Sequence, residues 1–272
     1  MSTSLWRSVN YKTPVKYFIN TFIREYDLSQ ANINALLYSG NLTEEEYKKY
    51  SLMNKQDREK SIGLWIRKDP SIYKAIQNGI IEAKKRLINE NNIEEYEIVS
   101  IKNDAVFVVG RELHKTEFAP FKFNVKNTYS VYMQLQDLEI YYGDYVDPLS
   151  NTIKTNIEVK GISDNSLIKH QNGILDIICD ACYKLQRENI KDTMQWISTI
   201  YAEFINRLLP KNYYREFDSY SKYKIKTFTQ FMTLDEIDDS MISIIDINRN
   251  LLIIRDLMGI IADIYHSNVK RF

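Results

Sequence analysis

Apolar residues recur every three to four positions between residues 70 and 89, which is the spacing of an amphipathic helix. Pro70 stands in its first turn, where proline is favoured because the amide hydrogen it lacks has no partner within a helix. We therefore predict a helix that ends at about residue 89 and buries one face. The apolar face comprises Ile72, Ala75, Ile76, Gly79, Ile80, Ala83 and Leu87, and the charged far side comprises Glu82, Lys84, Lys85 and Arg86.

Residues 96–110 follow a different pattern, with two arms rich in β-branched and aromatic residues around a short polar centre. The centre is Lys102-Asn103-Asp104, and this order predicts a hairpin with a polar turn. Tyr142-Gly143-Asp144 is interpreted as another turn, because Pro148 follows closely and would stop a strand. Further strands are predicted at residues 121–125, 128–135, 138–142 and 152–159.

From about residue 166 the pattern is helical, with helices predicted at residues 167–188, 190–209 and 234–265. The chain is thus predicted to be α+β. An antiparallel sheet with helices occupies residues 1–165, and an all-helical C-terminal domain occupies residues 166–272. Cys179 and Cys182 fall on the apolar face of the first of these helices, so we interpret them as buried small residues rather than zinc ligands.

The composition is that of a folded protein, with 272 residues, 44% of them hydrophobic, and 36 Lys+Arg against 36 Asp+Glu. The formal net charge of zero argues against a strongly basic coat for nucleic acid. Two cysteines cannot form a disulfide framework, and no apolar run approaches the roughly 18 residues that a membrane span needs. We therefore expect no membrane partner and a reducing compartment, namely the cytoplasm, or the host cytoplasm if the protein is viral.

The neutral total is a sum of opposed segments, because residues 48–68 and 211–231 are basic whereas residues 235–263 are acidic. The second basic segment alternates cations with aromatic rings, a pattern that suits base stacking and phosphate contacts with single-stranded nucleic acid. The alternative is a packed loop whose tyrosines bury their rings and hydrogen-bond their hydroxyls. The candidate nucleic-acid-binding residues are Lys211, Tyr213, Tyr214, Arg215, Lys222 and Lys224.

Two aspartates are candidates for metal chemistry. Asp104 lies at the tip of the predicted hairpin, and Asp27 ends an apolar stretch, residues 15–26, ahead of a short predicted helix. Mg²⁺ prefers one or two protein carboxylates together with substrate phosphates, so two strand-borne aspartates suit two-metal phosphoryl transfer. Each aspartate has an alternative. Residues 15–26 also fit a helix, with Asp27 as the cap of the next one, and Asn-Asp pairs favour hairpin turns whatever their function.

The surroundings of both aspartates resemble motifs of DNA polymerases. Asp27-Leu28-Ser29-Gln30, followed by an apolar helix, resembles motif A of family A, and residues 98–109 resemble motif C, the palm hairpin in which an apolar strand follows an aspartate. Lys55 and Gly63 have the spacing of the motif B lysine and glycine of family B. The resemblance covers about the first 165 residues, and the helical tail that follows resembles the family B thumb.

This resemblance implies a minimal or degenerate template-dependent polymerase palm with reduced fingers, of a phage type. It implies that Asp27 and Asp104 are the catalytic residues and bind Mg²⁺. The implied substrate-binding residues are Lys55, Arg58 and Lys60 for the incoming triphosphate, and Asn32 at the sugar-gating position.

The motifs also depart from the families. Ala105 stands where family A has glutamate, Lys102 stands where family B has its first aspartate, and Ile62 replaces the motif B tyrosine. Two hypotheses of different classes follow. The first is metal-dependent nucleotidyl transfer on a primer and template. The second is a catalytically inactive palm-derived module that binds nucleic acid or a protein subunit of a phage replication or transcription complex, with the C-terminal helices as the partner surface.

Overall fold

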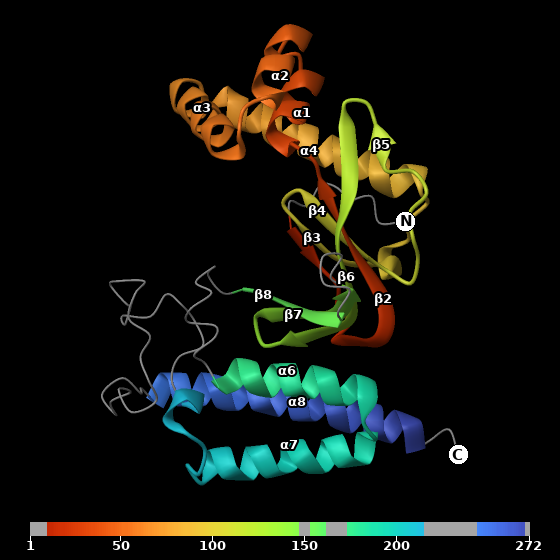
Figure 1. Cartoon of the computed structure of the whole chain (residues 1–272), viewed down its shortest axis with the longest axis vertical. Coiled ribbons are helices and arrows are strands. Elements are labelled where there is room, and N and C mark those ends of the chain that lie inside the picture. The colour runs from red at the N-terminus through yellow and green to blue at the C-terminus, as the bar shows by residue number, and fades with distance from the viewer. Residues whose placement is uncertain (1–9, 147–152, 162–172, 215–243, 270–272) are drawn as a thin grey trace. The chain divides into compact units, whose positions relative to one another are not determined.

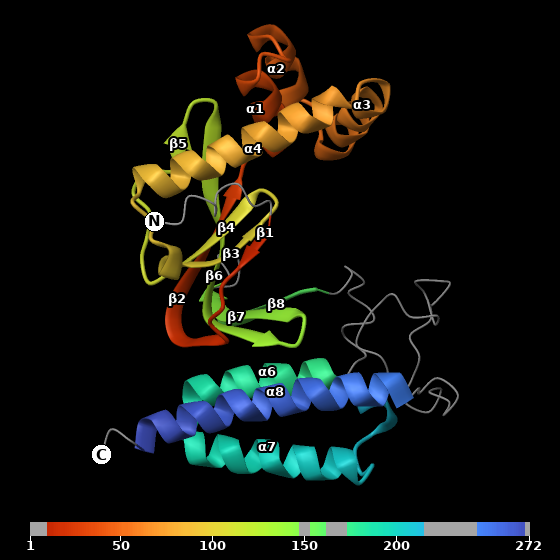
Figure 2. The ribbon, with the colours of Figure 1, turned by 180° about the vertical axis from the view of Figure 1, so that it is seen from behind.

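The computed structural model describes residues 10–146, 153–161, 173–214 and 244–269 (Figures 1 and 2). Their secondary structure confirms the α+β class, with an antiparallel sheet and a helical C-terminal region. Within these ranges, no helix combines the length and the apolar character needed to cross a membrane.

The chain forms two compact units, each made of two segments. Unit 1 comprises residues 1–14 and 21–128, and unit 2 comprises residues 15–20 and 129–272. This division differs from the predicted boundary at residue 165. That boundary marks the change from strands to helices, whereas the last strands of the sheet share a hydrophobic core with the C-terminal helices. Compact units and classes of secondary structure therefore do not coincide in this chain.

The strands pair antiparallel, and in the described ranges they follow the order β1-β3-β4-β2-β6-β7-β8, with β5 beside β6. Residues 15–26, for which a helix was the alternative, contribute to strand β2, and the hairpin predicted over residues 96–110 is confirmed as β3 and β4. The strands predicted at residues 121–125 and 128–135 form one continuous strand, β6. The bounds are β1 Asn10–Lys12, β2 Tyr17–Leu28, β3 Ile98–Lys102, β4 Ala105–Val109, β5 Glu117–Phe118, β6 Phe121–Leu135, β7 Leu138–Val146 and β8 Ile153–Lys160.

Unit 1 inserts its helices between β2 and β3 (Figure 1). They are α1 Ala31–Tyr38, α2 Glu44–Ser51, α3 Lys55–Lys68 and α4 Ser71–Glu90, and a short 3₁₀ helix, Glu95–Glu97, follows them. Thr43 begins α2 with a capping box, in which its hydroxyl accepts from the amide of Glu46 and its amide donates to the Glu46 carboxylate. Asn54 caps α3 by accepting from the amide of Asp57.

The helix predicted over residues 70–89 is confirmed as α4, but the prediction for one residue of its charged side is wrong. Lys84 is fully buried, whereas Glu82 and Arg86 keep partial exposure and form an ion pair. The reason is that α4 is covered by α1 as well as by strands, so its buried stripe is wider than its apolar residues indicate. A long lysine stem can lie in such a stripe because most of its length is hydrocarbon.

Helices α1 and α4 approach closely at Gly79, where a Cβ atom would lie 2.5 Å from the Cβ of Ala35 and 2.7 Å from its Cα. Gly79→Ala should therefore lower the free energy of unfolding by about 1–3 kcal/mol, although alanine normally favours a helix by about 1 kcal/mol. Chemical denaturation measures the change. Gly63→Ala in α3, where the Cβ would meet nothing within 4 Å, is the matched control and should be stabilising. Equal effects of the two substitutions would contradict the close contact.

In the part that the structure describes, unit 2 combines β7, β8, part of β6 and the start of β2 with three helices (Figure 2). Their apolar faces form a second core that includes Val131, Ile140, Ile178 and Leu257. The predicted helices are confirmed within the described residues, although the second ends at Ile205 and not at residue 209. The predicted helical residues 167–172 and 234–243 lie outside the described residues. The bounds are α6 Gly173–Arg187, α7 Ile190–Ile205 and α8 Ile244–Val269.

Two smaller predictions in unit 2 have different outcomes. The turn at Tyr142-Gly143-Asp144 is wrong, because β7 continues to Val146 and Asp144 pairs with Thr155 of β8. Cys179 and Cys182 are confirmed as half-buried and buried free thiols of α6. Burial raises the pKa of Cys179 to about 11, which disfavours the thiolate that metal binding requires.

Candidate active site

Asp27 is the penultimate residue of β2, so its side chain follows the alternation of a strand. Tyr26 and Leu28 are buried in the core of unit 1, and Asp27 therefore projects from the opposite face of the sheet. The next helix, α1, has Gln30 at its N-cap position, with a φ of 48° and no side-chain capping hydrogen bond. The alternative in which Asp27 caps that helix is wrong, since the aspartate belongs to the strand.

Asp104 lies in the turn between β3 and β4, as predicted. Lys102 pairs with Ala105, which leaves Asn103 and Asp104 as the two turn residues. Asn103 has a φ of 48°, a left-handed conformation that asparagine tolerates better than most residues. The turn interpretation is thus confirmed for the position of Asp104, and a turn at the end of a rigid hairpin is also a suitable place for a functional carboxylate.

Strand pairing brings the two aspartates together. β2 pairs with β4 so that Asp27 lies opposite Ala105, the residue that follows Asp104. The amide of Leu28 donates a hydrogen bond of 3.0 Å to the main-chain carbonyl oxygen of Asp104. The two positions are therefore fixed by the backbone of adjacent strands, before any side-chain interaction is considered.

A cavity of about 340 Å³ in unit 1 is lined by five of the predicted site residues. Its volume lies within the range of about 300–1,000 Å³ that is usual for small-molecule sites. The predicted residues in its wall are Asp27, Asp104, Asn32, Lys55 and Arg58, and Leu28, Ser29, Gln30, Ala31, Glu59, Ile62 and Asn124 complete it. The two predicted carboxylates and two predicted cations, from distant parts of the sequence, thus share one cavity, and Glu59 adds a third carboxylate to its wall.

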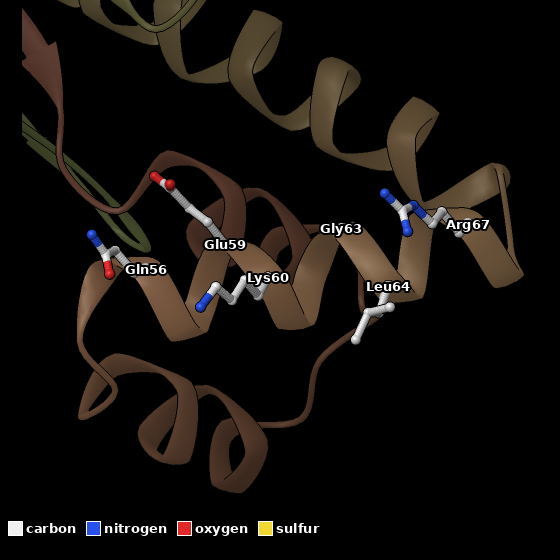
Figure 3. Close-up of a pocket in the computed structure, with 6 residues that line it drawn as sticks. All are labelled: Gln56, Glu59, Lys60, Gly63, Leu64 and Arg67. Carbon is white, nitrogen blue, oxygen red and sulfur yellow. The ribbon is translucent and has the colours of Figure 1, made fainter. Parts of the chain in front are cut away.

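Helix α3 divides its cations between two sides. Lys55, Arg58 and Ile62 are three or four residues apart and line the cavity from one side of the helix. Lys60 is five residues beyond Lys55, a rotation of about 140° around the helix, and it lines a second hollow on the other side of α3 (Figure 3). The assignment of Lys60 to a triphosphate site beside the two aspartates is therefore corrected: the structure brings Arg58, and not Lys60, to that cavity.

The charges of the site act on Asp27. Burial, and then repulsion by Asp104, raises the pKa of the Asp27 carboxyl; Lys126 lowers it, Glu25 raises it, and Lys55 lowers it. Carboxylates that repel each other across a cavity are stabilised by a cation, and hard oxygen ligands suit Mg²⁺. Among the described residues, no group of three or more His, Cys, Asp or Glu is placed to hold a metal. Water or substrate oxygens would have to complete the coordination, as is usual for Mg²⁺.

The raised pKa of Asp27 predicts that this carboxylate costs stability. The folded protein binds the proton more tightly than the unfolded chain, so the contribution of Asp27 falls as pH rises through the two pKa values. In metal-free buffer, Asp27→Asn should therefore raise the free energy of unfolding at pH about 7, with no gain below the ordinary aspartate pKa of about 3.9. Denaturant titrations measure this, with Asp57→Asn on the exposed first turn of α3 as the control. A loss of stability in Asp27→Asn alone would contradict the prediction.

Glu25 is a neighbour of the site and is not among the residues predicted from the sequence. Only 1% of this residue is exposed, and its carboxylate accepts hydrogen bonds from Asn127 Nδ2 at 2.6 Å and Lys126 Nζ at 3.4 Å. Side chains two residues apart in a strand lie on the same face, so Glu25 lies on the face of Asp27. This alternation could have identified Glu25 from the sequence. Asn124 was not predicted either, because no sequence pattern around it indicates that this residue of β6 lines the cavity.

The predicted nucleic-acid residues of unit 2 are corrected in part. Tyr214 is buried, with its ring centroid 4.8 Å from that of Phe204 and its hydroxyl accepting from the amide of Leu209. Tyr213 is half-buried, and its ring packs against Gly173. The packed arrangement therefore holds for Tyr214, whose buried ring is not available to stack on bases, whereas Tyr213 keeps part of its surface exposed. Lys211 is exposed in a 3₁₀ turn, Lys211–Tyr213, and Arg215, Lys222 and Lys224 lie outside the described residues.

Comparison with known proteins points to phage. No curated protein matches the chain. A family model described as "Bacteriophage PBS1 gene 130 protein" matches residues 1–263. The match covers nearly all of the chain and includes both aspartates and all described helices except the end of α8. The chain therefore belongs to the bacteriophage PBS1 gene 130 protein family.

Proposed function

We propose that this protein is a metal-dependent nucleotidyltransferase that extends a nucleic-acid primer on a template in the cytoplasm of an infected host. One observation carries the proposal: Asp27 and Asp104, from adjacent strands, line the same cavity as Lys55 and Arg58. Carboxylates that hold metal and cations that hold phosphates are the two requirements of phosphoryl transfer, which depends on positioning and electrostatic stabilisation.

The chain's own residues have separate roles in this proposal. Asp27 and Asp104 would hold Mg²⁺, which when bound activates the primer 3′-hydroxyl and stabilises the leaving pyrophosphate. Lys55 and Arg58 neutralise the triphosphate of the incoming nucleotide. Asn32, in the first turn of α1 and in the wall of the same cavity, contacts the sugar. Lys60 has no role in the nucleotide site.

A primed-template assay tests the proposal. The full-length protein is incubated with Mg²⁺ and either the four deoxynucleotides or the four ribonucleotides, on DNA and on RNA templates, and the primer is resolved on a denaturing gel. We expect extension with at least one combination and none when Mg²⁺ is removed by a chelator. Failure to incorporate any nucleotide on every template would reject the catalytic proposal.

A second candidate is a palm-derived module without catalysis, which binds nucleic acid or a protein subunit of a phage replication or transcription complex. It is favoured by Ala105, which stands where a further acid is expected, and by the absence of any three-residue acidic, His or Cys cluster in the described ranges. A module of this kind would bind a primed template without Mg²⁺, and Asp27→Asn would leave that affinity intact.

A further inference from the structure

We propose that the side of α3 turned away from the two aspartates is a binding face for a single strand of nucleic acid. We call it the α3 basic face. It lines a hollow of about 560 Å³ (Figure 3). The inference rests on the proposed function and deepens it, because it names where a template strand is held. We define the face as Gln56, Lys60, Gly63, Leu64 and Arg67, and Glu59 completes the lining of the hollow.

The α3 basic face carries positive charge that the protein does not neutralise. Lys60 and Arg67 are exposed, and neither has an ion-pair or hydrogen-bond partner in the part of the chain that the structure describes. Glu59 is the acid at the edge of the hollow, and its carboxylate lies 3.8 Å from the ammonium of Lys55. An exposed face with unneutralised cations attracts a polyanion, and nucleic-acid phosphates release counterions when they bind one.

The spacing of the two cations suits a strand. Lys60 and Arg67 are seven residues apart, which places them on nearly the same side of α3 and about 10 Å apart along its axis at 1.5 Å per residue. This distance corresponds to about three nucleotides of a stacked strand at roughly 3.4 Å each. The two side chains can therefore contact different phosphates of one strand.

The centre of the face favours unpaired bases over a duplex. Gly63 lies between the two cations, and no atom lies within 4 Å of the position that its Cβ would take, so a strand can approach the helix backbone. Leu64 is 57% exposed beside it and offers apolar surface. In a single strand the bases can turn their faces to such a surface, whereas in a duplex they are stacked and paired inside.

The position of the face links it to the candidate active site. Glu59 lines both the cavity and the hollow, so α3 has the nucleotide cations Lys55 and Arg58 on one side and the α3 basic face on the other. A strand held there lies one helix diameter, about 10 Å, from the triphosphate. This is a suitable path for a template that has not yet paired.

The test is the salt dependence of binding to fluorescein-labelled oligothymidylate, measured by anisotropy with the full chain. Lys60→Gln/Arg67→Gln removes two phosphate contacts. It should make the negative slope of log affinity against log salt shallower by about 1.4, at about 0.7 per contact, and weaken binding by at least about tenfold at low salt. Lys49→Gln/Lys74→Gln removes the same charge from exposed positions of α2 and α4 that line neither cavity. This matched control should keep the wild-type slope.

Three results would overturn the inference: an unchanged slope in Lys60→Gln/Arg67→Gln, an equal loss in the control variant, or an unlabelled duplex that competes as well as the single strand. The outcome is separable from that of the proposed function. A protein that shows the predicted loss of binding but extends no primer supports the α3 basic face and rejects catalysis. A protein that extends primers but binds oligothymidylate equally well in both double variants rejects the face and keeps catalysis.

Discussion

Asp104→Asn is expected to abolish primer extension, with a loss of at least about a thousandfold, or about 4 kcal/mol of transition-state stabilisation. The substitution keeps the size of the side chain, and asparagine is as well suited as aspartate to a two-residue hairpin turn. The fold around β3 and β4 should therefore survive, while one of the two carboxylates that could hold Mg²⁺ in the cavity is lost.

Single-turnover extension measures the effect of Asp104→Asn, and Mn²⁺ binding by calorimetry gives a readout that does not depend on catalysis. We expect Mn²⁺ affinity to fall together with the rate. Asp57→Asn is the matched control, because Asp57 is an exposed aspartate of the same unit that lines neither hollow of α3. Activity of Asp104→Asn within about tenfold of wild type, a difference of only about 1.4 kcal/mol, would exclude Asp104 as a metal ligand.

The local part of this structure could be predicted from the sequence. The amphipathic spacing of α4 and the polar centre of the β3–β4 hairpin are encoded in neighbouring residues, and both were located to within a few positions. The turn position of Asp104 followed from the hairpin pattern, whereas the residues ahead of Asp27 fitted both a strand and a helix. That the two aspartates lie together was predicted from their suitability for metal binding and from the motif resemblance, and not from a local pattern, because the adjacency of β2 and β4 is a contact between distant segments.

Other features depend on tertiary packing, which cannot be predicted from a single sequence. Tyr214 lies in a basic and aromatic segment of the kind that binds nucleic acid, but its ring packs against Phe204. Only the fold shows whether such a tyrosine is packed or available to stack on a base. Lys60 and Arg58 are both cations of α3, and which of them lines the cavity depends on the side of the helix that faces it. A division of the chain by secondary-structure class also differs from the division into compact units, between which the chain passes at residues 14/15, 20/21 and 128/129.

Lys84 is the clearest example of a residue whose burial depends on tertiary packing, and its burial leads to a prediction about stability. Burial lowers the pKa of Lys84 from 10.5 to about 8, against a smaller opposing effect of Asp104. Between these two values the unfolded chain carries a proton that the folded protein has released, so stability rises with pH across the window. The total rise attributable to Lys84 is about 3 kcal/mol, at about 1.4 kcal/mol per pH unit.

Lys84→Met should remove that rise and, in metal-free buffer, stabilise the protein at pH about 7 by up to about 3 kcal/mol, because methionine fills the same core space without a charge. Denaturant titrations at pH about 7 and about 10 measure the difference. Lys85→Met, on the partly exposed side of α4, is the control and should follow the wild-type pH dependence. A variant that is less stable than wild type at both pH values would show that a partner of the ammonium outweighs the cost of its burial. If instead Lys84→Met is more stable but binds Mn²⁺ with altered affinity, then the buried charge contributes to the field around Asp104, and the protein retains it at the expense of stability.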